Sequence, residues 1–155
     1  MKSIETLARI LRFFGWLSIV LGFIFLIGHK FISLASISSI QLFLDGLINL
    51  CLAHGLSKEE KWAWYSGLVI FSLGTLSIIV QFFFRLSFEY IFPLFFLIFF
   101  LYLLIKGRQI FIEQPKEKIS QWFHTPYFVV VVVGTILLYL ITGGILAYLY
   151  GWIPK

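Results

Sequence analysis

Residues 38–49 have the sequence SSIQLFLDGLIN and lie inside an apolar run long enough to cross a bilayer. Polar residues recur in this stretch at intervals of three and four: Ser38, Gln41, Asp45 and Asn49. On an α-helix this spacing places them on one face. An ionisable residue near a bilayer centre costs at least about 2.5–3.5 kcal/mol, so Asp45 is expected to face a partner helix or a water-filled cavity. The stretch therefore predicts a helix embedded in a membrane bundle.

The composition of the whole chain fits a lipid environment. Apolar residues make up 61% of the 155 residues and charged residues 12%, against about 45–50% and about 25% in soluble domains. A soluble domain of this length has too little interior to bury so much Phe, Leu and Ile. The apolar runs are almost continuous, whereas the strands of a membrane barrel alternate apolar and polar residues. We therefore predict an all-α, polytopic integral membrane protein.

Short polar segments divide the chain into five predicted transmembrane helices. These cover residues 7–27, 31–54, 62–84, 90–105 and 126–150, within one transmembrane domain over residues 1–155. The polar linker, residues 106–125, keeps enough apolar side chains to lie on the membrane surface, and Pro115 should break it into two short pieces. No cleavable signal peptide is expected, because the first apolar segment is too long and lacks a small-x-small site.

Basic residues near the ends of the spans predict the orientation. With the N-terminus inside, the cytoplasmic side receives Lys2, Arg9, Arg12, Lys58, Lys61, Lys106, Arg108, Lys116 and Lys118. The outer side receives only Lys30, Arg85 and Lys155, which completes the twelve Lys and Arg residues of the chain. Each inner loop carries more basic residues than each outer loop, so we predict an N-in, C-out topology with five spans.

Small residues predict where the helices touch. Gly15, Ser18 and Gly22 share one face of the first predicted span, which suits close helix contact. In the third span a seam of small and polar residues is expected to form another packing face: Ala63, Gly67, Gly74, Ser77 and Gln81. The fourth span has no polar face, so most of its perimeter is expected to contact lipid.

Four tryptophans are predicted interfacial anchors, because tryptophan prefers the headgroup region: Trp62, Trp64, Trp122 and Trp152. Two of them belong to residues 55–65, GLSKEEKWAWY, which combine Gly-Leu, a short basic link and Trp-Ala-Trp. This segment resembles one found in small bacterial four-helix inner-membrane proteins of unknown function. The resemblance covers the first four spans, whereas the fifth span and its linker depart from it. It implies a bacterial inner membrane and no site residues.

The polar face around Asp45 has two interpretations. In the first, Ser38, Gln41, Asp45 and Asn49 hold helices together or contact another subunit, with Gln81 as a further candidate. In the second, Asp45 is a proton or cation site coupled to movement. No Lys or Arg lies at matching depth in another span. A protonated, hydrogen-bonded Asp45, or one with a partner from another subunit, is therefore expected in place of an internal ion pair.

Catalytic motifs are missing from the sequence: it has no Gly-x-Ser-x-Gly, no His-Glu-x-x-His and no phosphate-binding glycine loop. His54, Glu59, Glu60 and His124 could gather at the inner face, but their spacing matches no known metal-ligand motif. Cys51 is the only cysteine, which excludes an internal disulfide. The positive charge is spread over loop ends, unlike that of a nucleic-acid-binding surface. We expect no enzyme activity, cofactor, bound metal or nucleic-acid partner.

The sequence thus favours a non-enzymatic accessory, scaffold or assembly subunit of a larger inner-membrane complex. Its partners would be the lipid bilayer and other membrane subunits, or further copies of itself. The alternative is a small oligomeric transporter or channel in which Asp45 binds a proton or cation. Five spans contain no inverted repeat, which weakens this alternative.

Overall fold

The computed structural model describes residues 2–28, 33–85, 90–112 and 119–149. Nearly all of these residues are helical, which confirms the predicted all-α fold. The helices within these ranges are α1 (Lys2–Gly28), α2 (Ser33–Ser57), α3 (Lys61–Arg85), α4 (Ile91–Lys106), α5 (Arg108–Ile112), α6 (Ile119–Trp122) and α7 (Pro126–Leu149). The short helices α5 and α6 lie in the predicted linker, on either side of Pro115, which is outside the described residues.

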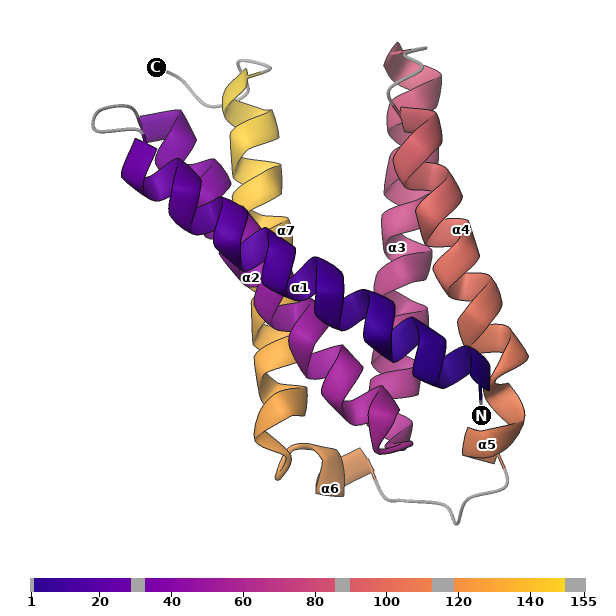
Figure 1. Ribbon diagram of the computed structural model, residues 1–155. Coiled ribbons are helices and arrows are strands. Elements are labelled where there is room, and N and C mark those ends of the chain that lie inside the picture. The colour runs from indigo at the N-terminus through magenta and orange to yellow at the C-terminus, as the bar shows by residue number, and fades with distance from the viewer. Residues whose placement is uncertain (1, 29–32, 86–89, 113–118, 150–155) are drawn as a thin grey trace.

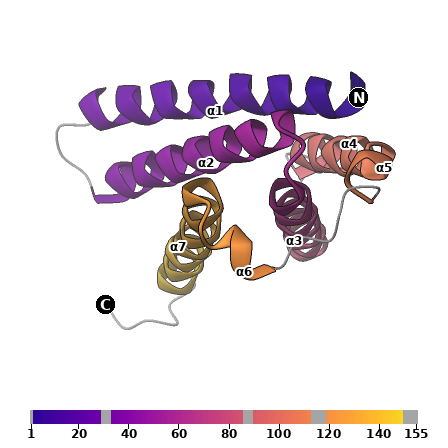
Figure 2. The same cartoon turned by 90° about the horizontal axis from the view of Figure 1, so that it is seen from below.

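The long helices alternate in direction, so the N-terminus, the α2–α3 link, α5 and α6 lie at one end of the molecule (Figure 1). We call this the lower end, after its place in the figure. Helices α1 and α2 lie side by side as one layer and cross α3 and α7 obliquely (Figure 2). Helix α7 packs on α2, and α4 packs on α3. The α1–α2–α7 group and the α3–α4 pair approach each other toward the lower end and diverge above it (Figure 1).

Glycines bring α1 and α2 into backbone contact. A Cβ atom on Gly15 would lie 3.0 Å from the carbonyl oxygen of Gly46, and one on Gly46 would lie 2.8 Å from the carbonyl oxygen of Gly15. A Cβ on Gly22 would lie 3.2 Å from the carbonyl oxygen of Ser39. Backbones this close leave no room for larger side chains at the crossing. The small-residue face predicted for the first span is therefore the face that packs on α2.

The seam of small residues on α3 receives α4. Cβ atoms on Gly67 and Gly74 would lie 3.3 and 3.4 Å from side-chain carbons of Leu104 and Leu97. Helix α4 consequently buries one face, which includes Leu104 and Phe100, and exposes the other. Only Phe100, Leu103 and Leu104 of α4 are buried, so the contact of most of this helix with lipid stays a prediction.

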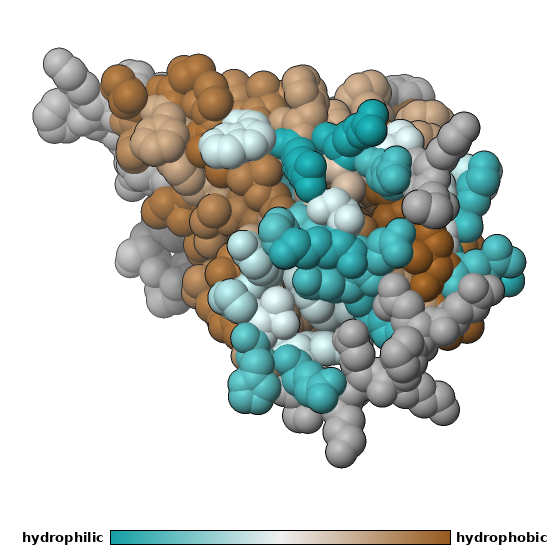
Figure 3. All heavy atoms as spheres, turned by 60° about the horizontal axis from the view of Figure 1, so that its bottom comes forward, coloured by the Kyte–Doolittle hydropathy of each residue, from teal (hydrophilic) through white to brown (hydrophobic). Residues whose placement is uncertain are grey.

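The best-enclosed core lies toward the lower end, where the two groups of helices meet. Leu7 and Leu11 of α1, Leu52 and Leu56 of α2, and Leu104 of α4 are completely enclosed. Farther along the helices large apolar side chains are exposed on every long helix, including Ile27, 75% exposed. Hydrophilic residues gather at the lower end (Figure 3). Apolar sides with a polar end are typical of helices that lie in lipid.

Three helices are long and apolar enough to cross a membrane, by length and composition: Ser3–Ile27 in α1, Ser39–Ser57 in α2 and Lys61–Phe83 in α3. Helix α4 and the stretch Pro126–Thr142 of α7 are apolar but shorter. The described residues thus agree with a helical membrane protein, and five spans remain a prediction.

Candidate functional site

Asp45 lies at the centre of a polar cluster between α1 and α2. Its Oδ2 atom accepts one hydrogen bond from Ser18 Oγ and one from Asn49 Nδ2, each 3.2 Å long. Ser18 lies between the glycines that bring the two backbones together, so its short side chain reaches Asp45. The other carboxyl oxygen, Oδ1, has no hydrogen-bond donor among the described residues. The carboxyl group therefore has room for one further partner.

A cavity of about 450 Å³ lies beside this cluster, among α1, α2, α3 and α4. Ser18, Asp45 and Asn49 form its polar part. The other lining residues are apolar: Leu11, Phe14, Phe71, Phe92, Pro93, Phe96, Leu97 and Phe100. The volume lies in the range of about 300–1,000 Å³ that is usual for small-molecule sites. The structure thus places the carboxyl group of Asp45 in the wall of a chamber large enough for a small organic molecule.

Five phenylalanine rings make the chamber mainly aromatic. Phe14 of α1 packs edge-on against Phe96 of α4, with ring centroids 5.9 Å apart, and Phe71 of α3 lies 5.3 Å from Phe100. None of these rings was predicted to belong to a site. Phe92, Phe96 and Phe100 recur every fourth residue, which places them on one face of a helix. That signal could have found them, but Phe and Leu on every side of α4 concealed it.

Gln41 connects α2 to a different neighbour, α7. Its Nε2 donates a hydrogen bond to Thr142 Oγ1 at 3.0 Å, and the Thr142 hydroxyl donates to the carbonyl oxygen of Leu138 at 2.8 Å. The polar residues of α2 thus serve two helices, because Asp45 bonds to α1 while Gln41 bonds to α7. The side chain of Ser38 lies outside the described residues.

Gln81 is not brought to this site. Its Nε2 donates to Ser77 Oγ, one turn earlier on the same helix, at 3.2 Å. The two polar residues of the α3 seam therefore bond to each other, and neither lines the cavity beside Asp45.

The predicted interfacial tryptophans of α3 are buried in the bundle. Trp64 is 9% exposed, and its indole N–H donates to the carbonyl oxygen of Leu104 at 3.0 Å while its ring stacks on Phe111 at 5.7 Å. Trp62 is 2% exposed, and its indole N–H donates to the carboxylate of Glu60. Trp64 thus connects the start of α3 to α4 and α5, whereas the Trp62 indole bonds within the link that precedes α3. Trp122 of α6 is half-buried, and Trp152 lies outside the described residues.

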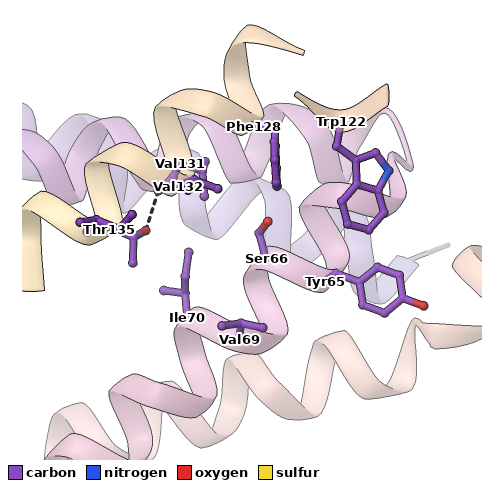
Figure 4. A pocket seen from close by; sticks show the side chains of 10 residues that line it. Tyr65, Ser66, Val69, Ile70, Trp122, Phe128, Val131, Val132 and Thr135 are labelled. Carbon is purple, nitrogen blue, oxygen red and sulfur yellow. Dashed lines mark hydrogen bonds between the residues drawn. The ribbon is translucent and has the colours of Figure 1, made fainter. Parts of the chain in front are cut away.

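A second cavity, of about 320 Å³, separates α3 from α7 near the lower end (Figure 4). Its lining is almost wholly apolar, with Trp122 of α6 and Phe128 of α7 at one side. The Thr135 hydroxyl is occupied by a hydrogen bond of 2.6 Å to the carbonyl oxygen of Val131. No charged residue lines this cavity, so it offers space for an apolar group and little chemistry.

The histidines and acids that could have gathered at the inner face do not form a metal site in the described part of the chain, which has no group of three potential ligands. The His54 ring packs instead against Tyr127 of α7, with centroids 4.3 Å apart. His54 Nε2 is buried and has no hydrogen-bond partner among the described residues. Its observed contact is therefore with an aromatic ring.

Comparison of the chain with protein-family models, with curated proteins and with solved structures finds no match in any of the three.

Proposed function

We propose that the chain is a five-span protein of a bacterial inner membrane with its N-terminus in the cytoplasm and its C-terminus outside. The strongest support for this topology comes from the lower end of the molecule. The start of α1, the α2–α3 link and the end of α4 lie there together (Figure 1). These segments, with α5, contain the members of the predicted inner set of basic residues that lie in the described ranges: Lys2, Arg9, Arg12, Lys58, Lys61, Lys106 and Arg108. Basic residues of cytoplasmic loops gather in this way.

Two of the five proposed spans differ in length from an average hydrocarbon core. Helix α7 has 24 residues, or about 36 Å, which exceeds an average hydrocarbon core of about 30 Å. Helix α4 has 16 residues, or about 24 Å, and crosses if the bilayer thins locally or if flanking charged side chains reach the surface. Alkaline phosphatase fused after Lys155 should be active, and the same enzyme inserted after Lys58 inactive. The reverse pattern would exclude this topology.

Within that membrane we propose a non-enzymatic role, as an accessory or assembly subunit of a larger complex. One observation carries the proposal: α3 and α7 contact each other near the lower end, where Trp62 packs against Phe128, and lie apart above it, although both continue as apolar helices (Figure 1). Large apolar side chains are exposed on both helices, including Leu76 of α3, 58% exposed, and Leu140 of α7, 66% exposed. A transmembrane helix of another subunit between α3 and α7 would complete the bundle above the second cavity.

The native mass of the tagged protein, expressed at its natural level and extracted in a mild detergent, tests this role. A discrete complex with other polypeptides is expected. A photo-reactive amino acid in place of Ile136, which lines the second cavity, should crosslink to a subunit. The same group in place of Trp16, 61% exposed on α1, serves as the matched control and should react with lipid. A lone monomer that gives no protein crosslink from Ile136 would contradict the proposal.

The cavity beside Asp45 favours a second candidate function, that of a small oligomeric transporter or channel. Ionisable residues inside a membrane bundle commonly mark ion or substrate pathways. The protein in liposomes would then conduct protons or cations, and Asp45→Asn would abolish the flux while the fold survives. Unchanged flux in Asp45→Asn would exclude Asp45 as the coupling residue. A pure homo-oligomer in the mass measurement would favour this candidate over the first.

A further inference from the structure

We propose that the cavity beside Asp45 binds an organic ammonium ion attached to an apolar body. The inference concerns binding and holds whether the chain acts as a subunit or as a carrier. It shares Asp45 with the transport candidate.

The carboxyl group of Asp45 can accept a hydrogen bond from a cationic ligand. Ser18 and Asn49 both donate to Oδ2, which leaves Oδ1 as the acceptor for a ligand. Among the residues that the structure describes, no Lys or Arg side chain lines the cavity, so these residues supply no countercharge there. An ammonium group brings both a positive charge and N–H donors, and charge-assisted hydrogen bonds are about twice as strong as neutral ones. An anion would meet repulsion and no basic group.

The phenylalanine rings that line the cavity favour a cation. A cation within about 6 Å of a phenyl centroid is attracted by the negative face of the ring. The cavity offers phenylalanines from three helices: Phe14 of α1, Phe71 of α3, and Phe92, Phe96 and Phe100 of α4. A chamber that combines one carboxyl group with several aromatic rings therefore favours a cation with apolar substituents over a neutral molecule of the same shape.

The volume of the cavity and its few polar groups suit an organic cation better than a metal ion. A metal ion would require several oxygen, nitrogen or sulfur ligands, and the lining supplies only the Ser18–Asp45–Asn49 cluster at one side. The cavity of about 450 Å³ is also far larger than a single ion. Its Phe, Leu and Pro walls would gain by contact with a hydrocarbon group. A primary amine with an aromatic or alkyl tail satisfies both the polar and the apolar parts.

Two sources can supply this chemistry. One is a free lipophilic amine, and the other is the ammonium headgroup of a phosphatidylethanolamine whose chains lie among the helices. Both present a positive nitrogen to Asp45 and carbon to the rings.

Binding to the purified full chain in a nonionic detergent tests the proposal, with three probes of similar size measured by equilibrium dialysis. Phenylbutylammonium should bind at least about tenfold more tightly than phenylbutanol, because one hydrogen bond to a charged group increases the affinity by about that factor. Phenylbutyrate should not bind. Asp45→Asn should weaken the binding of the ammonium about tenfold and leave the alcohol unchanged. Glu5→Gln removes an equal charge at an exposed position of α1 and should change neither.

A second variant keeps the test decisive if Asp45→Asn fails to fold. Phe96→Leu removes one ring from the cavity and should weaken the binding of the ammonium about threefold, with little effect on the alcohol. Its matched control, Phe83→Leu, removes a ring that is 71% exposed on α3 and should have no effect. Equal affinity for the ammonium and the alcohol in the natural chain, or unchanged ammonium binding in folded Asp45→Asn, would overturn the proposal.

Nanodiscs distinguish the two sources. If the headgroup is the natural occupant, phosphatidylethanolamine should compete with phenylbutylammonium and phosphatidylglycerol should not. Equal probe affinity in both lipids would identify a free amine. The binding assay applies no ion gradient, so it measures binding and not transport. A protein that fails to transport can therefore still bind the ammonium, and a protein that fails to bind the ammonium can still carry protons through Asp45.

Discussion

Gly15 and Gly46 face each other across the α1–α2 crossing, and each lies where a Cβ atom would approach the other's carbonyl oxygen to 3.0 Å or less. The hydrogen bond from Ser18 to Asp45 spans the same crossing one turn farther along. Backbone approach and polar contact therefore depend on each other, because Ser18 reaches Asp45 only while the two glycines hold the helices together.

We expect Gly46→Ala to destabilise the fold by about 1–3 kcal/mol, the usual cost of overpacking. The new methyl group would lie 2.6 Å from Ile19 Cγ1 and 2.8 Å from the Gly15 carbonyl oxygen, and backbone cannot move aside cheaply. Thermal unfolding in detergent measures the loss. Gly74→Ala is the matched control, since its methyl group would meet only the Leu97 side chain at 3.4 Å, and it should unfold at the same temperature or higher.

Asp45→Leu should cost about 1–2 kcal/mol of stability, because Ser18 and Asn49 lose their common acceptor inside the bundle. Asp45→Asn keeps an oxygen in the same place and should cost less than about 0.5 kcal/mol. Chemical denaturation of both variants in the same detergent checks the difference. Equal stability of the two variants would mean that neither hydrogen bond supports the fold.

The Gln41–Thr142 hydrogen bond predicts an energetic coupling between α2 and α7. Gln41→Leu and Thr142→Val should each destabilise the protein, and the double variant should lose less than the sum by about 0.6–1.7 kcal/mol, the range measured for hydrogen bonds between membrane helices. Gln81→Leu with Thr142→Val, which share no contact among the described residues, provides the control and should show additive effects.

Trp64→Phe should destabilise the lower end by about 1–2 kcal/mol. The substitution removes the indole N–H that donates to the Leu104 carbonyl oxygen, and the smaller ring stacks less extensively on Phe111. Trp16→Phe removes an indole that is 61% exposed and should change the stability by less than about 0.5 kcal/mol. Urea unfolding followed by far-UV circular dichroism compares the two. The opposite order would show that Trp64 acts at the membrane surface alone.

Much of the fold follows from one-dimensional patterns. Apolar runs between polar turns predict the long helices, and small residues at helical spacing predict that Gly15 and Gly22 lie at a contact. These signals are local, because each depends on residues within a few turns. The hydrogen bonds of Asp45 to Asn49 and of Gln81 to Ser77 are equally local, since each joins residues four apart.

Contacts between distant segments could not be predicted in the same way. Gln41 and Thr142 lie 101 residues apart, and a threonine whose hydroxyl bonds to its own helix gives no sign of a second partner. Trp62 and Trp64 have the composition of an interfacial belt, yet their burial depends on how α4, α5 and α7 close over the start of α3. The seam on α3 was recognisable as a packing face, but only the arrangement of helices identifies α4 as its neighbour.

The divergence of the two helix groups has a mechanical consequence. The α3–α4 pair is supported near its lower end, where Trp62 contacts Phe128 of α7, so that end serves as a fulcrum. Helix α3 has 25 residues, or about 37 Å, which makes it a long lever arm. A rotation of about 5° at the fulcrum would carry the far end through about 3 Å over such a length. Displacements smaller than a bond length among the buried rings of the lower end would thus be amplified into movements the size of an atom at the opposite face.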